Sequence, residues 1–331
     1  MIANCIRPIA CLLILAGQLL AITPIPSSKR IEAHVDAILV APDDRPMHMP
    51  TDVAVDGTGR IYVADGANDR IVCFDRNGKF ETALSGWDDD QLNQPVGLTV
   101  DSQNNLWIAD TGSHRLLVVD SEGKLINRIV LPEAEGGHPF DPTDLAVTAD
   151  GKRTYIVDND NHRIVIRDNE SGRLIPKGQF GRSVGRFQWP FMISIGPDGY
   201  IYISETIGAW IQRMAPSDRW AGLIGRWGVE LGRFYRPKGI AVDKQSWLYV
   251  SDSTLGVVQV FDSQGRVKGV LTDKQGNLLR FEHPMGMWID AQGKLYVVEL
   301  KRNRVAVVTL QANPQLQTNH SARRTGTGGQ Q

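Results

Sequence analysis

The chain has 331 residues and a formal net charge of -1. This balance argues against nucleic acid as a partner, because such binding requires a strongly basic face. Two of the three cysteines lie within the first eleven residues, so the rest of the chain can form neither a disulfide framework nor a CxxC metal pair.

The N-terminus carries the features of an export signal. Residues 1–21 combine one arginine with a short apolar run that ends in small residues. This order is typical of a secretory signal peptide, and the run is too short and too interrupted to span a membrane. We therefore expect cleavage after Ala21, export to the periplasm or the extracellular space, and no membrane span in the mature protein. An uncleaved anchor is the alternative.

A similar segment occurs six times in the chain, each time after a proline. The spacing between successive prolines runs from 45 to 48 residues. Repetition at a fixed period of about 40–50 residues indicates a solenoid or a propeller. The six prolines are Pro50, Pro95, Pro142, Pro190, Pro237 and Pro284.

Each repeat contains four short apolar segments separated by turn residues. In the first repeat they begin with residues 53–55, 61–63 and 71–74, and Asn77-Gly78 marks the turn before the fourth. Strands that are apolar on both faces fit small sheets packed between neighbours, and radial repetition of four-stranded sheets gives a β-propeller. The sequence therefore predicts an all-β, six-bladed β-propeller over residues 31–310.

The last repeat ends one strand short. It stops after the third apolar segment, at residues 305–309. Residues 34–40 lie about as far before Pro50 as the other fourth strands lie before their prolines. We therefore expect an N-terminal strand to complete the last blade and close the ring of a monomer. Residues 311–331 are rich in Gln, Asn, Ser, Thr and Gly, a composition that predicts a disordered polar tail.

The repeated motifs resemble the NHL repeat. They read Pro-x-[Gly/Asp]-[Val/Leu/Ile]-Ala-Val, then [Ile/Leu]-Tyr-Val-[Ala/Ser]-Asp, then Asn-x-Arg-Ile. This resemblance implies a propeller but several possible functions, since NHL propellers serve as protein- or RNA-binding platforms, as extracellular sensor domains and, in the peptidylglycine-amidating lyases, as enzymes. The expected export and the near-zero charge disfavour RNA.

Most repeats place an acid five residues before an arginine, at the corner between their second and third strands. Because the pattern repeats, we interpret it as a structural ion pair that fixes each blade. The predicted pairs are Asp65 with Arg70, Asp110 with Arg115, Asp158 with Arg163, and Glu299 with Arg304.

Two repeats depart from this pattern. Five residues after Glu205 the chain has Trp210 in place of an arginine, and five residues after Asp252 it has Val257. Either the repeat has drifted there or the surface has been remodelled for a ligand, and both interpretations stay open. Trp189 adds a second aromatic residue near the same corner, and exposed aromatics beside charges often mark binding patches. We predict a protein or small-molecule ligand at Trp189, Glu205, Trp210 and Asp252, on the face that bears the channel mouth.

The resemblance to the amidating lyases also bears on metals. Those enzymes place zinc-binding histidines directly after the blade proline. No zinc triad is expected here, because those positions hold Thr51, Val96, Thr143, Phe191, Lys238 and Met285.

One residue further on, two repeats carry an aspartate where most of the others carry glycine. The resemblance implies that Asp52 and Asp144 are ligands of a Ca²⁺ ion in the central channel, helped by backbone carbonyls. The alternative is a pair of ordinary solvated or turn-capping residues.

These observations favour an exported binding module. The alternative is a metal-assisted lyase or hydrolase that works at the mouth of the channel.

Overall fold

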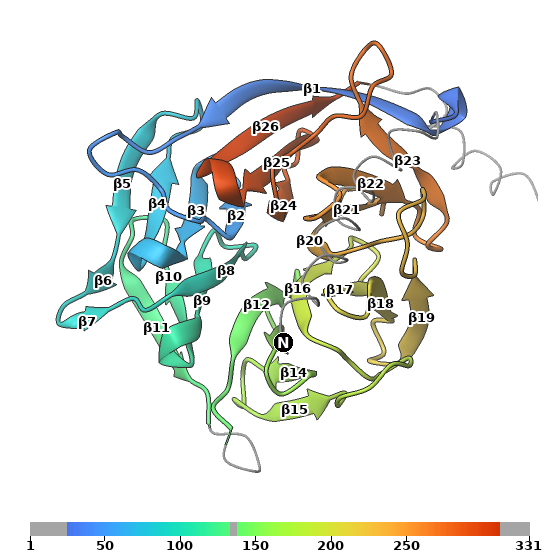
Figure 1. The fold of residues 1–331 in the computed structure, drawn as a ribbon. Helices are drawn as coiled ribbons and strands as arrows, with labels where there is room; N and C mark the ends of the chain where they lie inside the picture. The colour runs from blue at the N-terminus through green and yellow to red at the C-terminus, as the bar shows by residue number, and fades with distance from the viewer. Residues whose placement is uncertain (1–24, 133–137, 312–331) are drawn as a thin grey trace, which may run out of the picture.

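The computed structural model describes residues 25–132 and 138–311, and in these ranges the chain folds into β-strands joined by turns and four short 3-10 helices. The 3-10 helices are η1 (Ser27–Lys29), η2 (Gly66–Asn68), η3 (Thr111–Ser113) and η4 (Leu300–Arg302). Figure 1 shows the sheets arranged in a ring about a central axis, which confirms an all-β propeller.

Four antiparallel sheets contain four strands each, paired in chain order. The first contains β2 (Asp52–Val55), β3 (Ile61–Asp65), β4 (Arg70–Phe74) and β5 (Phe80–Leu84). The second contains β8 (Pro95–Val100), β9 (Leu106–Asp110), β10 (Arg115–Val119) and β11 (Leu125–Val130). The third contains β12 (Pro142–Val147), β13 (Arg153–Asp158), β14 (Arg163–Asp168) and β15 (Leu174–Lys177). The fourth contains β16 (Pro190–Ile195), β17 (Ile201–Glu205), β18 (Trp210–Met214) and β19 (Trp220–Ile224).

The remaining strands form an eight-stranded sheet and a small hairpin. The large sheet runs in the order β20-β21-β22-β23-β1-β26-β25-β24. Its strands are β1 (Arg30–Leu39), β20 (Pro237–Val242), β21 (Leu248–Asp252), β22 (Val257–Phe261), β23 (Val267–Thr272), β24 (Pro284–Ile289), β25 (Lys294–Glu299) and β26 (Arg304–Leu310). The hairpin contains β6 (Gly86–Trp87) and β7 (Asp90–Gln91).

The strands that follow the prolines line the axis. Each of β2, β8, β12, β16, β20 and β24 contacts the corresponding strand on either side, so that these inner strands make a continuous ring. The second strand of each sheet is buried on both faces, as β3 and β9 illustrate. The core therefore lies between adjacent sheets, where Tyr62 and Ile71 of one pack with Leu98 and Ile108 of the next.

An aspartate turn shapes many of the hairpins. Asp75 accepts hydrogen bonds from the backbone N–H groups of Asn77 and Lys79, and Gly78 adopts a φ of 80° that favours glycine. The same arrangement recurs at Asp120 with Gly123 and at Asp290 with Gly293. These turns keep the strands short and the sheets alike.

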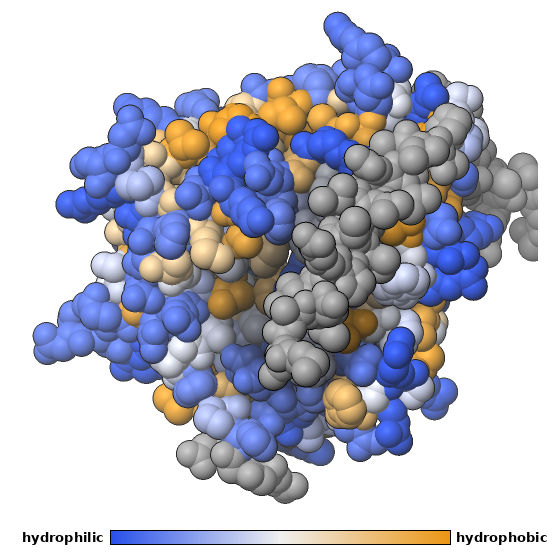
Figure 2. All heavy atoms as spheres, viewed as in Figure 1, coloured by the Kyte–Doolittle hydropathy of each residue, from blue (hydrophilic) through white to orange (hydrophobic). Residues whose placement is uncertain are grey.

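Strand β1 pairs with two other strands of the large sheet. It runs antiparallel to β26, from Ala33 opposite Leu310 to Leu39 opposite Val305, and its first three residues run parallel to β23. In Figure 2 hydrophobic side chains gather along the upper rim, where Figure 1 places β1 and β26. Leu39 is buried there, whereas Val35 and Ile38 stay 39% exposed.

Both predicted terminal segments fall largely outside the described residues. The leader at 1–21 lies wholly outside them, as does all but the first residue of the tail at 311–331. Within the residues that the structure describes, no helix has the length and apolar character that a membrane crossing requires.

Candidate functional site

Each corner between a second and a third strand contains a buried acid. Four of these acids pair with the arginine five residues later, over N–O distances of 2.5 to 2.7 Å. We call them the arginine-paired corners: Asp65 with Arg70, Asp110 with Arg115, Asp158 with Arg163, and Glu299 with Arg304.

All six corner acids also hold the loop that precedes the inner strand. The carboxylate of each acid also accepts a hydrogen bond from a backbone N–H one or two residues before the proline. This bond fixes where the inner strand begins. The donors are His48 to Asp65, Asn93 to Asp110, Asp141 to Asp158, Gln188 to Glu205, Tyr235 to Asp252, and Glu282 to Glu299.

The other two acids form what we call the arginine-free corners. Glu205 accepts hydrogen bonds from Trp210 Nε1 at 2.5 Å and from Gln212 Nε2 at 2.8 Å. Asp252 instead accepts the backbone N–H groups of Thr254 and Leu255. Burial raises the pKa of Glu205 to about 7 and also raises that of Asp252, because the donors carry no charge to offset desolvation.

Three of the four predicted ligand residues thus contact their own sheets. Glu205 and Asp252 are buried, Trp210 donates to Glu205, and none of them lines either of the two cavities described below. Trp189 differs, since it is 42% exposed and lines a cavity. Their role in binding stays a prediction.

The cavity at Trp189, which we call the face cavity, lies beside the start of two inner strands. Its volume is about 340 Å³. Trp189 and Phe191 flank Pro190 at the start of β16, Thr206 and Ile207 follow β17, and two more residues come from the neighbouring sheets. The full lining is Asn159, Trp189, Phe191, Thr206, Ile207 and Lys238.

Aromatic contacts and hydrogen bonds hold the walls of the face cavity in place. Trp189 packs edge-on against the ring of His162, with centroids 4.7 Å apart, and its backbone N–H points to His162 Nδ1 at 3.3 Å. The Lys238 Nζ lies 3.5 Å from the centre of the Phe191 ring. Asn159 donates to the Pro190 carbonyl. The walls are therefore preformed, as in most small-molecule sites.

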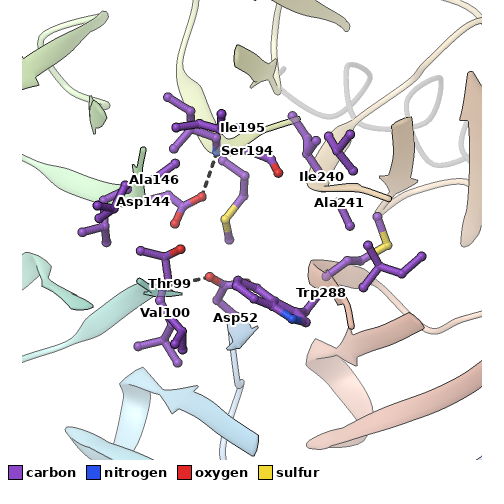
Figure 3. Close-up of a pocket in the computed structure, with 18 residues that line it drawn as sticks. Asp52, Thr99, Val100, Asp144, Ala146, Ser194, Ile195, Ile240, Ala241 and Trp288 are labelled. Atoms are coloured by element: carbon purple, nitrogen blue, oxygen red, sulfur yellow. Dashed lines mark hydrogen bonds between the residues drawn. The ribbon is translucent and has the colours of Figure 1, made fainter. Parts of the chain in front are cut away.

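A second cavity, of about 230 Å³, lies on the axis of the ring. Figure 3 shows Asp52 and Asp144 pointing into it from different inner strands, with Ile240 and Ala241 across from Asp144 and Trp288 beside Asp52. We call it the axial cavity.

The two aspartates occupy matching positions. Asp52 accepts the N–H of Leu98 and Asp144 accepts that of Ile193, each at 2.8 Å and each from the next inner strand. In each case the preceding inner strand supplies a glycine: a Cβ at Gly97 would meet Asp144 Oδ1 at 2.6 Å, and one at Gly286 would meet Asp52 Oδ1 at 2.0 Å. Glycine is required at both positions because no larger residue leaves room for the carboxylate.

Burial raises the pKa of both aspartates in the axial cavity. That of Asp52 reaches about 7, and that of Asp144 lies well above its usual value, with a further contribution from the charge of Asp52. Asp144 Oδ1 is buried without a hydrogen-bond partner among the described residues. Within the same residues, no three His, Cys, Asp or Glu side chains are grouped as metal ligands.

Sequence reasoning missed most of the face cavity. The sequence marks Phe191 and Lys238 only as residues that cannot bind zinc, and no motif marks Asn159, Thr206 or Ile207. The available signal was positional: a residue that directly follows a repeat proline starts an inner strand, so Phe191 and Lys238 had to lie at the same end of the ring as Trp189.

Comparison with protein families identifies the repeat. The family model described as NHL repeat matches residues 47–74 and 92–122, which cover the end of the first pre-proline loop and most of the first two sheets. No curated protein matches the chain.

Solved structures share the fold at low sequence identity. A streptogramin B lyase has a TM-score of 0.59 and 12% identity over 85% of this chain and 98% of its own. A gluconolactonase from Xanthomonas campestris has a TM-score of 0.60 and 17% identity over 88% and 99%. An auxiliary nutrient binding protein from Bacteroides thetaiotaomicron has a TM-score of 0.63 and 13% identity over 86% and 77%. At these identities the likeness extends to the fold alone.

Proposed function

On the premise that this chain is an NHL-repeat β-propeller, we propose that it is an exported binding module that takes its ligand on the face carrying the face cavity. The observation that carries the proposal is the cavity itself, a preformed hollow of about 340 Å³ with aromatic walls and few polar groups. Such hollows are the usual sites of small-molecule recognition. The nutrient binding protein with the same fold supports a binding role.

A ligand screen tests this function. A library of small molecules is scanned by ligand-observed NMR against the mature protein, Trp189→Ala and Trp227→Ala. Trp227 is 60% exposed and lies outside the lining of the face cavity, so it serves as the matched control. We expect ligands that bind the wild type and the control but not Trp189→Ala. Ligands that bind all three proteins equally, or an absence of ligands, would contradict the proposal.

We further propose that the ring has six blades, closed by the N-terminal strand. The eight-stranded sheet divides at β1 into β20–β23 and a second blade made of β24, β25, β26 and β1, in keeping with six prolines and six inner strands. Deleting residues 25–40 should therefore open the last blade, expose Val305 and Ala306, and cost several kcal/mol, since burying one large side chain contributes about 1.5–3 kcal/mol.

The control for this deletion is a chain that ends at residue 311. An unchanged melting temperature on removal of β1, with the control also unchanged, would contradict the closure.

Export is tested separately, by expressing the full chain with its leader and sequencing the N-terminus of the protein recovered outside the cytoplasm. An N-terminus at residue 22 is expected, whereas an intact Met1 in the cytoplasmic fraction would contradict it.

A second candidate is a metal-assisted lyase or hydrolase at the channel mouth. The observation that favours it is the buried pair of carboxylates in the axial cavity, where Asp144 Oδ1 has no partner among the described residues. The lyase and gluconolactonase structures with this fold are compatible with such a role. Ca²⁺ suits hard oxygen ligands and irregular geometry, so Asp52 and Asp144 would hold it with neighbouring backbone carbonyls.

A calcium titration tests the ion site. A bound ion stabilises only the folded ring, so Ca²⁺ should raise the melting temperature and a chelator should lower it. Asp52→Asn combined with Asp144→Asn should abolish that response. If Ca²⁺ does not shift the melting curve of the wild type, Asp52 and Asp144 hold no Ca²⁺ and are two neutralised carboxyl groups.

A further inference from the structure

The face cavity contains a lysine without an acidic partner. Lys238 begins an inner strand directly after Pro237, and its Nζ lies over the Phe191 ring. Two influences act on its ammonium group, burial and the charge of Arg236, and both disfavour the charged form. Among the described residues no carboxylate forms an ion pair with it, so its charge is offset only by the face of an aromatic ring.

A hydroxyl group in the same cavity also lacks a partner. Thr206 Oγ1 is buried and has no hydrogen bond within the described part of the chain, although Thr206 lines the cavity together with Lys238. Leaving a buried hydroxyl unpaired is unfavourable, so its presence points to a group that pairs with it when the cavity is filled. A cation and a hydroxyl group that line one cavity can together bind an oxyanion such as a carboxylate.

Apart from the Asn159 amide, which donates to the Pro190 carbonyl, the remaining walls are flat or apolar. Trp189 and Phe191 contribute aromatic rings and Ile207, 40% exposed, contributes an aliphatic edge. The cavity is at the low end of the range for ligand sites, about 300–1,000 Å³, so it accommodates one or two fused rings rather than a peptide.

We infer that the face cavity binds a small aromatic carboxylate, with its flat body against Trp189 and Phe191 and its carboxylate at Lys238 and Thr206. This inference rests on the proposed binding function and names the ligand class of that site. The polar end is chosen by charge: an ammonium without an acid gains a charge-assisted hydrogen bond from a carboxylate, whereas a neutral amide offers a weaker one.

The ionisation of Lys238 supports the same assignment. Burial, with a smaller contribution from Arg236, lowers the pKa of Lys238 to about 8, and the other lining residues are uncharged. The lysine is therefore mostly charged at pH 7 and mostly neutral at pH 9. A carboxylate should bind about tenfold more weakly at pH 9, because only about a tenth of the protein then carries the ammonium.

A matched pair of probes tests the inference. The binding of 2-naphthoate and of 2-naphthamide, which share size and shape but not charge, is measured by titration calorimetry at pH 7 and pH 9. We expect the wild type to bind the naphthoate about tenfold more tightly than the naphthamide at pH 7, and to lose that preference at pH 9. Lys238→Met should remove the preference at both pH values, while Lys238→Arg should keep it at both.

The controls separate this inference from the proposed function. Thr206→Val should weaken the naphthoate severalfold, and melting curves establish that each variant is folded. Equal binding of the two probes by the wild type would overturn the ligand class but leave the binding module intact. If neither probe binds, the ligand class is again overturned, and the Trp189→Ala screen decides the binding function independently.

Discussion

The arginine-paired and arginine-free corners do the same structural task by different means. At every corner a buried acid holds the loop before an inner strand. At four of them an arginine balances its charge, whereas at Glu205 and Asp252 only neutral N–H donors do. The acid is therefore the constant part of these corners, whereas the group that compensates its charge differs between them.

The exchange extends beyond the missing arginine. Both arginine-free corners carry a buried glutamine two residues after the arginine position, and it binds the backbone of the loop before the proline. Gln212 accepts the N–H of Gly185 and donates to the Arg186 carbonyl, and Gln259 does the same with Gly232 and Arg233. The two arginine-free corners therefore share a second means of holding the loop before the proline, in which a buried glutamine binds its backbone.

The largest effect should come from breaking an arginine-paired corner. Arg115→Met would leave Asp110 buried and unpaired and would also release Asp90, which Arg115 contacts at 2.7 Å. Breaking a buried pair from one side costs about 3–5 kcal/mol. Chemical denaturation measures it, with Arg266→Met as control, since that arginine's side chain is 71% exposed and its pair with Asp262 should contribute less than about 1 kcal/mol. Equal losses in the two variants would contradict the comparison.

An intermediate effect should come from the pH dependence of an arginine-free corner. The pKa of Glu205 is about 7 when folded and 4.5 ordinarily, so the folded state keeps a proton that the unfolded state releases. Its contribution to stability should therefore fall as the pH rises from about 4.5 to about 7 and level off above, by about 1–3 kcal/mol.

Glu205→Gln measures that contribution by difference. Asp52 and Asp144 also have raised pKa values and contribute a slope of the same sign, so the wild type and the variant must be compared across the range. The difference in unfolding free energy between Glu205→Gln and the wild type should shrink as the pH falls. Parallel stability curves for the two proteins would show that folding does not raise the pKa of Glu205.

The smallest effect should come from converting one kind of corner into the other. Trp210→Arg places an arginine five residues after Glu205, as in the four arginine-paired corners. A paired charge lowers the pKa of the carboxyl, so the pH dependence due to Glu205 should disappear. Net stability at pH 7 should change by less than about 1 kcal/mol, because the new ion pair offsets the lost aromatic packing. If stability still falls with rising pH as in the wild type, an arginine at position 210 does not reach the Glu205 carboxylate.

Much of the propeller could be predicted because repetition fixes it. Five of the six prolines begin inner strands, and Pro50 lies two residues before β2. Strand β1 pairs with β26 near the place expected for the N-terminal strand, while closure of the ring by that strand stays a proposal. Its parallel contact with β23 was not expected, because it involves residues 30–32, which precede the apolar stretch that marked the strand.

The cavities were harder to predict because they combine residues from separate repeats. Asp52 and Asp144 could be placed in the axial cavity, since their position in the repeat places them on inner strands. The neighbours of Trp189 in the face cavity could not be predicted from the sequence. Thr206 and Lys238 belong to different sheets, and neither residue type stands out in the sequence. Likewise, Asp90 reaches Arg115 only because the β6–β7 hairpin turns it inward.

The position of β1 also has a consequence for the order of folding. His34 and Gln311, which are neighbours at its edge, are 277 residues apart in the chain. Closing so long a loop carries a large entropic cost, and contacts of such separation form slowly. Of the described strands β1 is synthesised first and β26 last, so β1 cannot pair with β26 until the sheets between them have been synthesised. In the proposed six-bladed ring, the pairing of β1 with β26 should therefore be the last and rate-limiting step of folding.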